Sequence, residues 1–546
     1  MEHSILHALQ LSGTVVALGG AILMIAFMFP ALRAGNLRQP PPQVASQLGN
    51  SVATWTFRAG LFAIFAALMN LIVDVAEIDS RTVFGGFNPQ AVWDFATITT
   101  VGHLSLCRIG ALAFTTIAAR LKGRWKWLLV LLGGFAAALF ESLVSHAAAQ
   151  PNGRSSAIIA ELSHVLAGSL WMGVLVHLLL ARRAILARRD DRSLAFFANI
   201  LARFSPVALT FAGLLGLSGF VLTIRYLCTP AAVPTSAYGF TFSVKMGLML
   251  PLLYAAYVNY KQILPGLRVA GKLSDELRAE LLGRFGKTLE LEVTAGVLVL
   301  TLAGILGSVS PPEQWGTLRL TSAQVNALTS PHLPITTVAD PETFYGAPER
   351  TVADLHYSEF THSWSGVMVL LLGCCWLVEI MGGQAGFWAA RAWPLLFIPF
   401  PFFIAVAADP EVWLLRKVTF WETIQDPQLL EHQLGAMFAF ILVALGWMDR
   451  RRPADQRPLG YSLPVVMILG SLLLLGHAHS NFSSTQDLTN LINVQHAIFG
   501  AFGLFAGLLR WLTLRGLVPW RPMQLVWPGL VIGLGLFMAF CYREAV

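Results

Sequence analysis

Charged side chains are scarce in this sequence. Asp, Glu, Lys and Arg make up 12% of its 546 residues, whereas about a quarter is typical of soluble domains. Hydrophobic residues account for 55%, and the mean hydropathy is +0.64. This balance excludes a soluble globular protein and predicts an integral membrane protein whose main partner is the lipid bilayer.

Cysteines are also few, and a nucleotide-binding motif is missing. The five cysteines show no CxxC spacing, which excludes a disulfide scaffold. There is no G-x-x-x-x-G-K-[ST] loop to couple nucleotide hydrolysis to transport. No basic patch is interleaved with aromatic residues, so we expect no nucleic-acid partner.

Long apolar runs are what the sequence does contain. A membrane helix needs about 20 apolar residues, and we expect an all-α, polytopic transmembrane helix bundle of about 14 spans. The predicted spans are 5–32, 52–76, 93–119, 125–147, 157–181, 203–226, 238–260, 286–308, 361–381, 392–408, 428–448, 461–479, 488–513 and 523–542.

Basic residues predict the orientation, because Lys and Arg favour the cytoplasmic side. With the N-terminus outside, 27 of the 37 basic residues fall in inner loops and eight in outer ones, while Arg108 and Lys245 lie within spans. Both termini are therefore predicted to be extracytoplasmic.

A polar, Pro-rich segment divides the chain. Residues 309–360 form an extracytoplasmic loop in this topology and separate an eight-helix domain, 1–308, from a six-helix domain, 361–546. The sequence KLSDELRAELLGRFGK, at 272–287, predicts an amphipathic helix on the inner membrane surface.

The thirteen histidines are distributed unevenly across the predicted membrane. His177 alone lies near the inner face, and the others lie outside or in outer halves of spans. Histidine near hydrocarbon serves metal ligation, haem ligation or proton relay. The histidines in or at the outer ends of predicted helices are His103, His146, His164, His362, His432, His477, His479 and His496.

Two similar arrangements stand out among these histidines. SHA at 145–147 is followed by His164, and GHA at 476–478 is followed by His496, each across a short loop. We expect His146 and His164 to meet at one site, and His477 or His479 to meet His496 at a second, with His432 as a further ligand. Glu161, three residues before His164, shares its helical face and is a candidate ligand.

A buried arginine needs an anionic partner or a polar cavity. Arg108 follows His103 within a predicted span, and Glu141 on the next predicted span, 125–147, is one candidate partner. Glu141, Glu161 and Lys245 are candidate relay groups if transport is coupled to protons.

Several stretches of the first 308 residues resemble the copper resistance D family of bacterial inner-membrane proteins. They include TVGHLSLCRIGAL at 100–112, SHAAAQ at 145–150, ELSHVLAGSLWMGVL at 161–175 and RFGKTLELEVTAGVLVLTLAGILGSVSPP at 284–312. The resemblance marks His146, His164, Trp171, Arg108 and Lys245. It implies copper handling, often beside a small periplasmic copper-binding protein, and residues 361–546 resemble the extra membrane domain of longer members.

Two functions follow as hypotheses. The first is a non-enzymatic protein that binds copper at the extracytoplasmic side and translocates or handles it. The alternative is a membrane oxidoreductase in which histidine pairs bind haem b, although an electron path across the bilayer would want histidines in both leaflets. The metal-site residues are His103, His146, Glu161, His164, His362, His432, His477, His479 and His496. The oligomeric state stays open.

Overall fold

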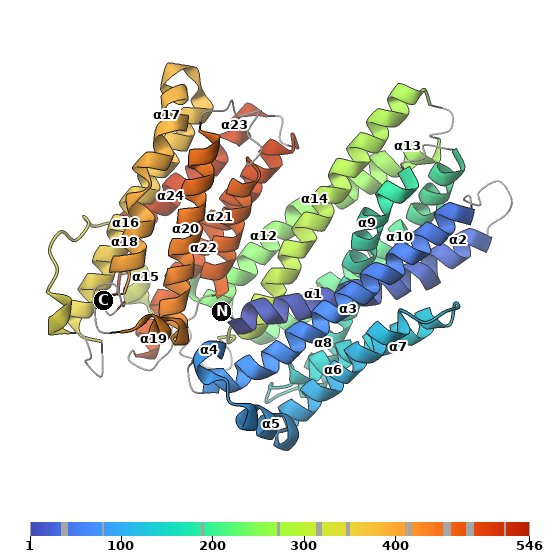
Figure 1. Ribbon diagram of the computed structural model, residues 1–546, viewed down its shortest axis with the longest axis horizontal. Helices are drawn as coiled ribbons and strands as arrows, with labels where there is room; N and C mark the ends of the chain where they lie inside the picture. Colours follow the sequence, from blue (N-terminus) through green and yellow to red (C-terminus); the bar gives the residue numbers. More distant parts are fainter. Residues whose placement is uncertain are drawn as a thin grey trace.

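The computed structural model is helical throughout the part of the chain that it describes. That part comprises residues 2–33, 42–78, 81–186, 191–269, 273–312, 319–344, 350–409, 412, 418–450, 460–476, 485–517 and 520–544. Within these ranges no strand occurs. Figure 1 shows a bundle in which both termini lie at the same end, beside α4 (Val83–Gly86) and α19 (Phe420–Gln425).

The first part of the chain contains the helices up to Ser308. They are α1 (Glu2–Ile22), η1 (Leu23–Met28), α2 (Phe29–Arg33), α3 (Pro42–Ile78), α4, α5 (Pro89–Ile98), α6 (Thr100–Ala118), α7 (Lys126–Val144), α8 (Arg154–Gly168), η2 (Ser169–Gly173), α9 (Val174–Leu186), α10 (Asp191–Leu227), α11 (Ala232–Thr235), α12 (Ala237–Val258), η3 (Asn259–Ile263), α13 (Leu264–Arg268) and α14 (Asp275–Ser308).

The second part of the chain follows the polar segment. Its helices are α15 (Ser322–Leu328), a 3-10 turn (Pro341–Thr343), α16 (Val352–Met381), α17 (Gly383–Leu396), α18 (Pro399–Ala407), α19, α20 (Pro427–Asp449), α21 (Ser462–Gly476), α22 (Gln486–Leu514), α23 (Arg521–Gln524) and α24 (Val526–Phe540).

The expected polytopic bundle is confirmed. Thirteen helical rods in the described ranges are long and apolar enough to cross a membrane, and α21 is a shorter apolar helix of 15 residues. The tenth span, predicted as 392–408, begins nine residues earlier, because the rod runs over Gly383–Ala407 as α17 and α18. Pro399 stands at the start of α18, where proline is tolerated because its missing N–H would be unpaired there anyway.

The predicted amphipathic surface helix at 272–287 is wrong. Asp275 already begins α14, which continues without a break for 34 residues into the bundle. Ser274 caps this helix by accepting a hydrogen bond from the Leu277 N–H, and Asp275 and Glu276 favour the positive N-terminal end of the helix dipole. The amphipathic sequence is therefore the inner end of a long span.

The two parts of the bundle meet along α12 and α14. A buried apolar cluster joins these helices to α21 and α22, with Leu248 and Leu302 on one side and Leu475, Leu504 and Leu508 on the other. Burying side chains of this kind favours association by shape and dispersion. This cluster therefore holds the two parts together.

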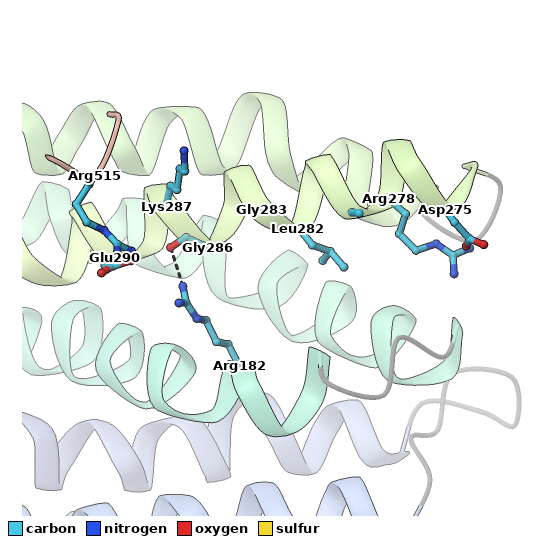
Figure 2. Close-up of a pocket in the computed structure, with 10 residues that line it drawn as sticks. Arg182, Asp275, Arg278, Leu282, Gly283, Gly286, Lys287, Glu290 and Arg515 are labelled. Carbon is cyan, nitrogen blue, oxygen red and sulfur yellow. Dashed lines mark hydrogen bonds and ion pairs between the residues drawn. The ribbon is translucent and has the colours of Figure 1, made fainter. Parts of the chain in front are cut away.

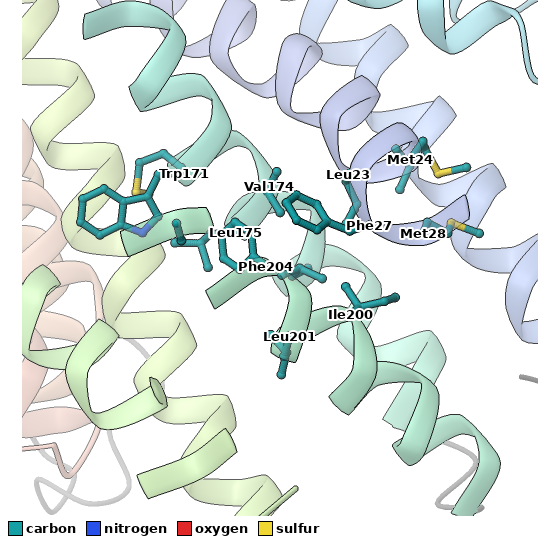
Figure 3. Close-up of a cluster of buried hydrophobic side chains, with 14 of the residues drawn as sticks. Leu23, Met24, Phe27, Met28, Trp171, Val174, Leu175, Ile200, Leu201 and Phe204 are labelled. Atoms are coloured by element: carbon teal, nitrogen blue, oxygen red, sulfur yellow. The ribbon is translucent and has the colours of Figure 1, made fainter. Parts of the chain in front are cut away.

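Three short π-helical segments, η1, η2 and η3, interrupt the first eight spans. Figure 3 shows η1 and η2 in a cluster with α10, where Phe27 meets Phe204 edge to face with ring centroids 5.5 Å apart. Gly19 on α1 faces Gly173 of η2 so closely that a Cβ on either residue would strike the backbone of the other. π-Helical turns are frequent at functional sites, which directs attention to the residues that they carry.

The polar segment between the two parts lies against the outer end of the bundle. Leu320 and Leu328 pack against Leu491 and Val494 of α22. The His332 backbone N–H donates to the Phe540 carbonyl at 2.8 Å. The described residues of this segment therefore cover the second part.

Candidate functional site

The Glu141 carboxylate is the centre of a buried polar network in the first part. It accepts hydrogen bonds from Arg108 Nη1 at 3.0 Å, from His7 Nε2 at 2.7 Å and from the Gln10 side-chain amide. Asn70 Nδ2 extends the network by donating to Gln10 Oε1 at 3.3 Å. Helices α1, α3, α6 and α7 are thus tied together by polar side chains inside the membrane.

The ion pair that the sequence suggested for Arg108 and Glu141 is present. Arg108 is 6% exposed and Glu141 8%, so each charge depends on the other for compensation. His7 was overlooked because a histidine close to the start of a span usually lies at the interface. Its i, i+4 spacing from His3, which places both on one helical face, is the signal that was available.

Three histidines gather at the outer end of this network. The rings of His3 and His7 lie 6.0 Å apart between centroids, and both histidines interact electrostatically with His146. His3 Nδ1 lies 2.8 Å from an oxygen of Asp74. The Nε2 atom of His146 is buried without a hydrogen-bond partner among the described residues, and an imidazole nitrogen of this kind is available to a metal ion.

The expected site shared by His146 and His164 is not formed. His164 lies ten residues below the start of α8, about 15 Å along the helix axis, whereas His146 lies in the loop above. His164 Nδ1 contacts Ser218 Oγ at 3.1 Å, and its charged neighbour is Lys245. Lys245 also interacts with Glu161, so these three residues form a separate polar group deeper in the bundle.

A third polar group lies deeper still, at the π-helical segments. Glu292 on α14 is 3% exposed. Its Oε2 accepts a hydrogen bond from Asn259 Nδ2 of η3 at 2.8 Å, and its Oε1 accepts one from Trp171 Nε1 of η2 at 3.4 Å. The family resemblance marks Trp171, whereas Glu292 stands in the mixed string LELEV, where nothing in the sequence distinguishes it.

In the second part, three histidines line one cavity of about 290 Å³ whose other walls are mostly apolar. They come from three helices, His362 from α16, His432 from α20 and His496 from α22, and Glu431 lines the same cavity. The rings of His362 and His496 are 5.5 Å apart between centroids. Of the residues predicted for the second site, His432 and His496 line this cavity together with His362, while His477 and His479 lie outside the described residues.

Each of these three rings is anchored through Nδ1. His362 donates to the Ser358 carbonyl at 2.8 Å, His496 to the Ile492 carbonyl at 2.9 Å, and His432 contacts the carboxylate of Asp409 at 2.8 Å. Metal-binding histidines are commonly oriented in this way by a carbonyl or carboxylate on the nitrogen that does not bind the metal. The chemistry of the cavity suits an ion that takes imidazole ligands.

The chain terminus closes the outer side of this cavity. Tyr542 stacks on His362 with centroids 4.0 Å apart, and its hydroxyl donates to Glu544. Glu544 is ion-paired with Arg350 at 2.7 Å. Burial disfavours the charge on Arg350, but the carboxylates of Glu544 and Asp354 outweigh it and raise the pKa of Arg350, so the clamp stays charged at any physiological pH.

Other predicted metal residues do not converge. His103 lies exposed in the first turn of α6, where its Nε2 bonds the Thr97 carbonyl at 2.7 Å. It therefore lies nearer the outer end of its helix than the sequence suggested, and it takes no part in a histidine group. Over the described ranges, no group of three or more His, Cys, Asp or Glu side chains is arranged to hold a metal ion.

A charged cavity of about 690 Å³ lies at the end of the bundle away from the two termini (Figure 2). Arg182 donates to the Gly286 carbonyl at 2.7 Å, and Arg515 is ion-paired with Glu290. Arg515 follows α22, so this contact ties the second part to α14 of the first. Basic residues at this end agree with the predicted inner face.

These features define a class: a multi-pass helical membrane protein with buried histidines and carboxylates placed at successive depths. Residues 4–157 match the copper resistance protein D-like N-terminal domain, and residues 198–306 match copper resistance protein D. The two matched regions lie within the first part of the chain, which is therefore similar to the copper resistance D family.

One curated relative illustrates the similarity. The copper transport protein CutJ of Bacillus subtilis is 28% identical over 207 residues, which are 37% of this chain. The matched part is 35% of CutJ, so the chain spans about a third of that relative's length. No solved structure matches the chain.

Proposed function

We propose that the protein binds copper ions at the extracytoplasmic side of a bacterial inner membrane and moves them into or across the bilayer. The observation that carries this proposal is the gathering of His3, His7 and His146 beside Glu141, at the outer end of the family-matched spans. Neutral imidazole is a good ligand for copper. Copper is the substrate here, so it must be released as well as bound.

The lack of a three-ligand group among the described residues fits this transient role. A tight cage of three or four ligands would retain the ion. Conduction requires binding that is weak enough for the ion to leave the site. We propose that one copper ion is held first by two histidines, His146 and His3, beside His7, whose two ring nitrogens contact the Gly304 carbonyl and Glu141. The group of His164, Glu161 and Lys245 lies next along the path.

The cavity of His362, His432 and His496 is proposed as a second copper site in the same protein. Its support is the anchoring of all three rings through Nδ1. An outer-face site of this kind suits receipt of copper from a small soluble copper-binding protein in the periplasm.

Binding of haem b remains the second candidate for this cavity. The observation in its favour is the apolar lining below the histidines, which includes Trp376, Phe397 and Phe400. Haem would bind through imidazole nitrogens from facing helices. In that case the second part would move electrons, and the protein would be an oxidoreductase.

Titration of the purified full chain with Cu(I), together with its absorption spectrum, tests both functions. We expect His146→Ala to weaken copper binding at the first site at least tenfold, because a two-ligand site loses half of its donors. His356→Ala is the matched control, since His356 is 49% exposed and lies outside all three groups. Wild-type copper affinity in His146→Ala contradicts the first site. A haem spectrum that disappears in His496→Ala assigns the cavity to haem instead.

A further inference from the structure

Glu292 is a buried acid that the copper path described above does not use. It is the eighteenth residue of the 34-residue α14 and is 3% exposed. Its two oxygens are held by an amide and an indole, and both of these donors are uncharged. The Thr288 hydroxyl supports the arrangement by donating to Asn259 Oδ1 at 2.5 Å.

The carboxyl groups of the other two buried polar groups of the first part have cations as neighbours. Glu141 is ion-paired with Arg108, and Glu161 interacts with Lys245. Glu292 has no cation among its interaction partners in the described residues. A carboxylate without a counter-ion is costly inside a membrane, and acids of this kind in membrane proteins serve as proton relays.

The charged and titratable groups on the neighbouring elements are committed elsewhere. On α14, Glu290 pairs with Arg515, and Lys287 lies near Gly516. On α9, Arg182 donates to Gly286 and His177 bonds the Val16 carbonyl. The cationic side chains on α12 and η3 are Lys245, which interacts with Glu161, and Lys261, which lies over the Tyr260 ring.

Both hydrogen-bond donors belong to π-helical segments. Trp171 lies in η2 and Asn259 lies in η3, so one carboxyl group bridges two local breaks in regular α-helix. Figure 3 shows Trp171 at the edge of the apolar cluster that also holds η1. A change in the hydrogen bonding of Glu292 is therefore transmitted directly to the two segments where the helices are least regular.

The position of Glu292 separates it from the outer groups. Asn259 follows Lys245 by fourteen residues on one helical rod, which is about 21 Å along the axis. The Lys245 and Glu161 pair thus lies toward the outer end of the rod, and Glu292 lies toward the inner end.

We infer that Glu292 is a proton-binding site on the inner side of the path, and this inference rests on the proposed copper movement. The carboxylate takes one proton from the inner aqueous phase to give the carboxylic acid, and it returns one proton when it ionises. Asn259 and Trp171 donate to the ionised form, so its protonation weakens their hold and frees η2 and η3 to shift. Copper movement is coupled to this proton.

Infrared difference spectroscopy of the full chain in lipid vesicles tests the proton site directly. Changing the pH should produce a carboxylic-acid C=O band that shifts in D₂O, and Glu292→Gln should remove it. Glu141→Gln is the control and should leave the band, because Glu141 is held ionised by Arg108. Persistence of the band in Glu292→Gln, or its absence from the wild type, overturns the proton site.

A more conservative variant allows the proton site to be tested even if Glu292→Gln does not fold. Trp171→Phe keeps an aromatic ring but removes one donor to the carboxylate, so the midpoint of the infrared transition should move to higher pH by at least half a unit. An unchanged midpoint contradicts the role of Trp171.

Copper measurements on the same vesicles separate this inference from the proposed function. We expect Glu292→Gln to bind Cu(I) with wild-type affinity at the outer site and to lose at least tenfold in copper-dependent proton movement. Unimpaired proton movement refutes the coupling alone. If the wild type does not bind copper, the proposed function is refuted. The infrared band would still report on the proton site in that case.

Discussion

Replacing Arg108 by Met should destabilise the protein strongly. The Nη1 atom lies 3.0 Å from Glu141 Oε2, and both residues are less than a tenth exposed. Removing one member of a buried pair leaves an uncompensated charge and costs about 3 to 5 kcal/mol. Methionine fills much of the space of the arginine stem, so most of this cost is electrostatic rather than a packing loss.

The double variant Arg108→Met with Glu141→Gln separates charge from shape. Glutamine retains hydrogen-bonding groups for His7 and Gln10, and the network then carries no buried charge. We expect the double variant to be about as stable as either single variant, or more stable. The coupling energy between Arg108 and Glu141 should then lie near the upper end of the range of about 0.5 to 3 kcal/mol that is typical of residues in contact.

Equilibrium unfolding in mixed detergent micelles, followed by circular dichroism, measures all four proteins of this cycle. Arg225→Met is the matched control, because Arg225 is partly exposed and bonds the Asn152 carbonyl and the Ser156 hydroxyl; it should change the stability by about 0.5 kcal/mol or less. Additive costs in the cycle would refute the claim that the two charges compensate each other.

Three further outcomes are expected. Gly173→Ala should cost about 1 to 3 kcal/mol of unfolding free energy, because the new methyl group meets the Gly19 backbone; Gly213→Ala, with nothing within 4 Å, should be neutral or slightly stabilising in the same unfolding assay. Single cysteines at Asp275 should be labelled only from the cytoplasm and those at Asn152 or Ser330 only from the periplasm, and reversed labelling would refute the topology. Asp409→Asn should weaken ligand binding at the His432 cavity about 10- to 100-fold, since it removes the carboxylate that orients the ring; unchanged affinity in the Cu(I) titration would contradict this role.

The fold was more predictable than the site because hydropathy acts over whole segments. Twenty apolar residues specify a span whatever their neighbours are, so the helical class and most spans follow from the sequence. Arg108 and Glu141 were also predictable as partners, since a buried arginine has few acceptable solutions. The sequence SLWMG, by contrast, carries no sign of a π-helical segment, because a few residues that favour ordinary helix are redirected there by the packing of Gly173 against Gly19.

The histidine pairing failed for a geometric reason. A short loop places the ends of two helices side by side, but it fixes nothing about residues ten positions further along. His146 therefore meets His7 and His3 of α1, which are distant in sequence, while His164 meets Ser218 of α10. Glu292 could not be recognised from its own neighbours either, because its partners come from α-helical rods more than thirty residues away.

The order of charges along the first part constrains how a cation would pass through it. The outer Glu141 is neutralised by Arg108, so a copper ion there meets imidazoles rather than a strong net negative charge that would hold it. The next group carries Lys245, whose positive charge repels a cation. This repulsion is reduced if the negative charge of Glu161 offsets it or if Lys245 loses its proton. Beyond it, Glu292 has only neutral donors, so it attracts positive charge toward the inner side. A proton bound at Glu292 would cancel that negative charge and the attraction with it. On the proposed path, copper movement toward the inner side would therefore be favoured while Glu292 is ionised, and a steady cycle would need the proton to return after the copper ion has left.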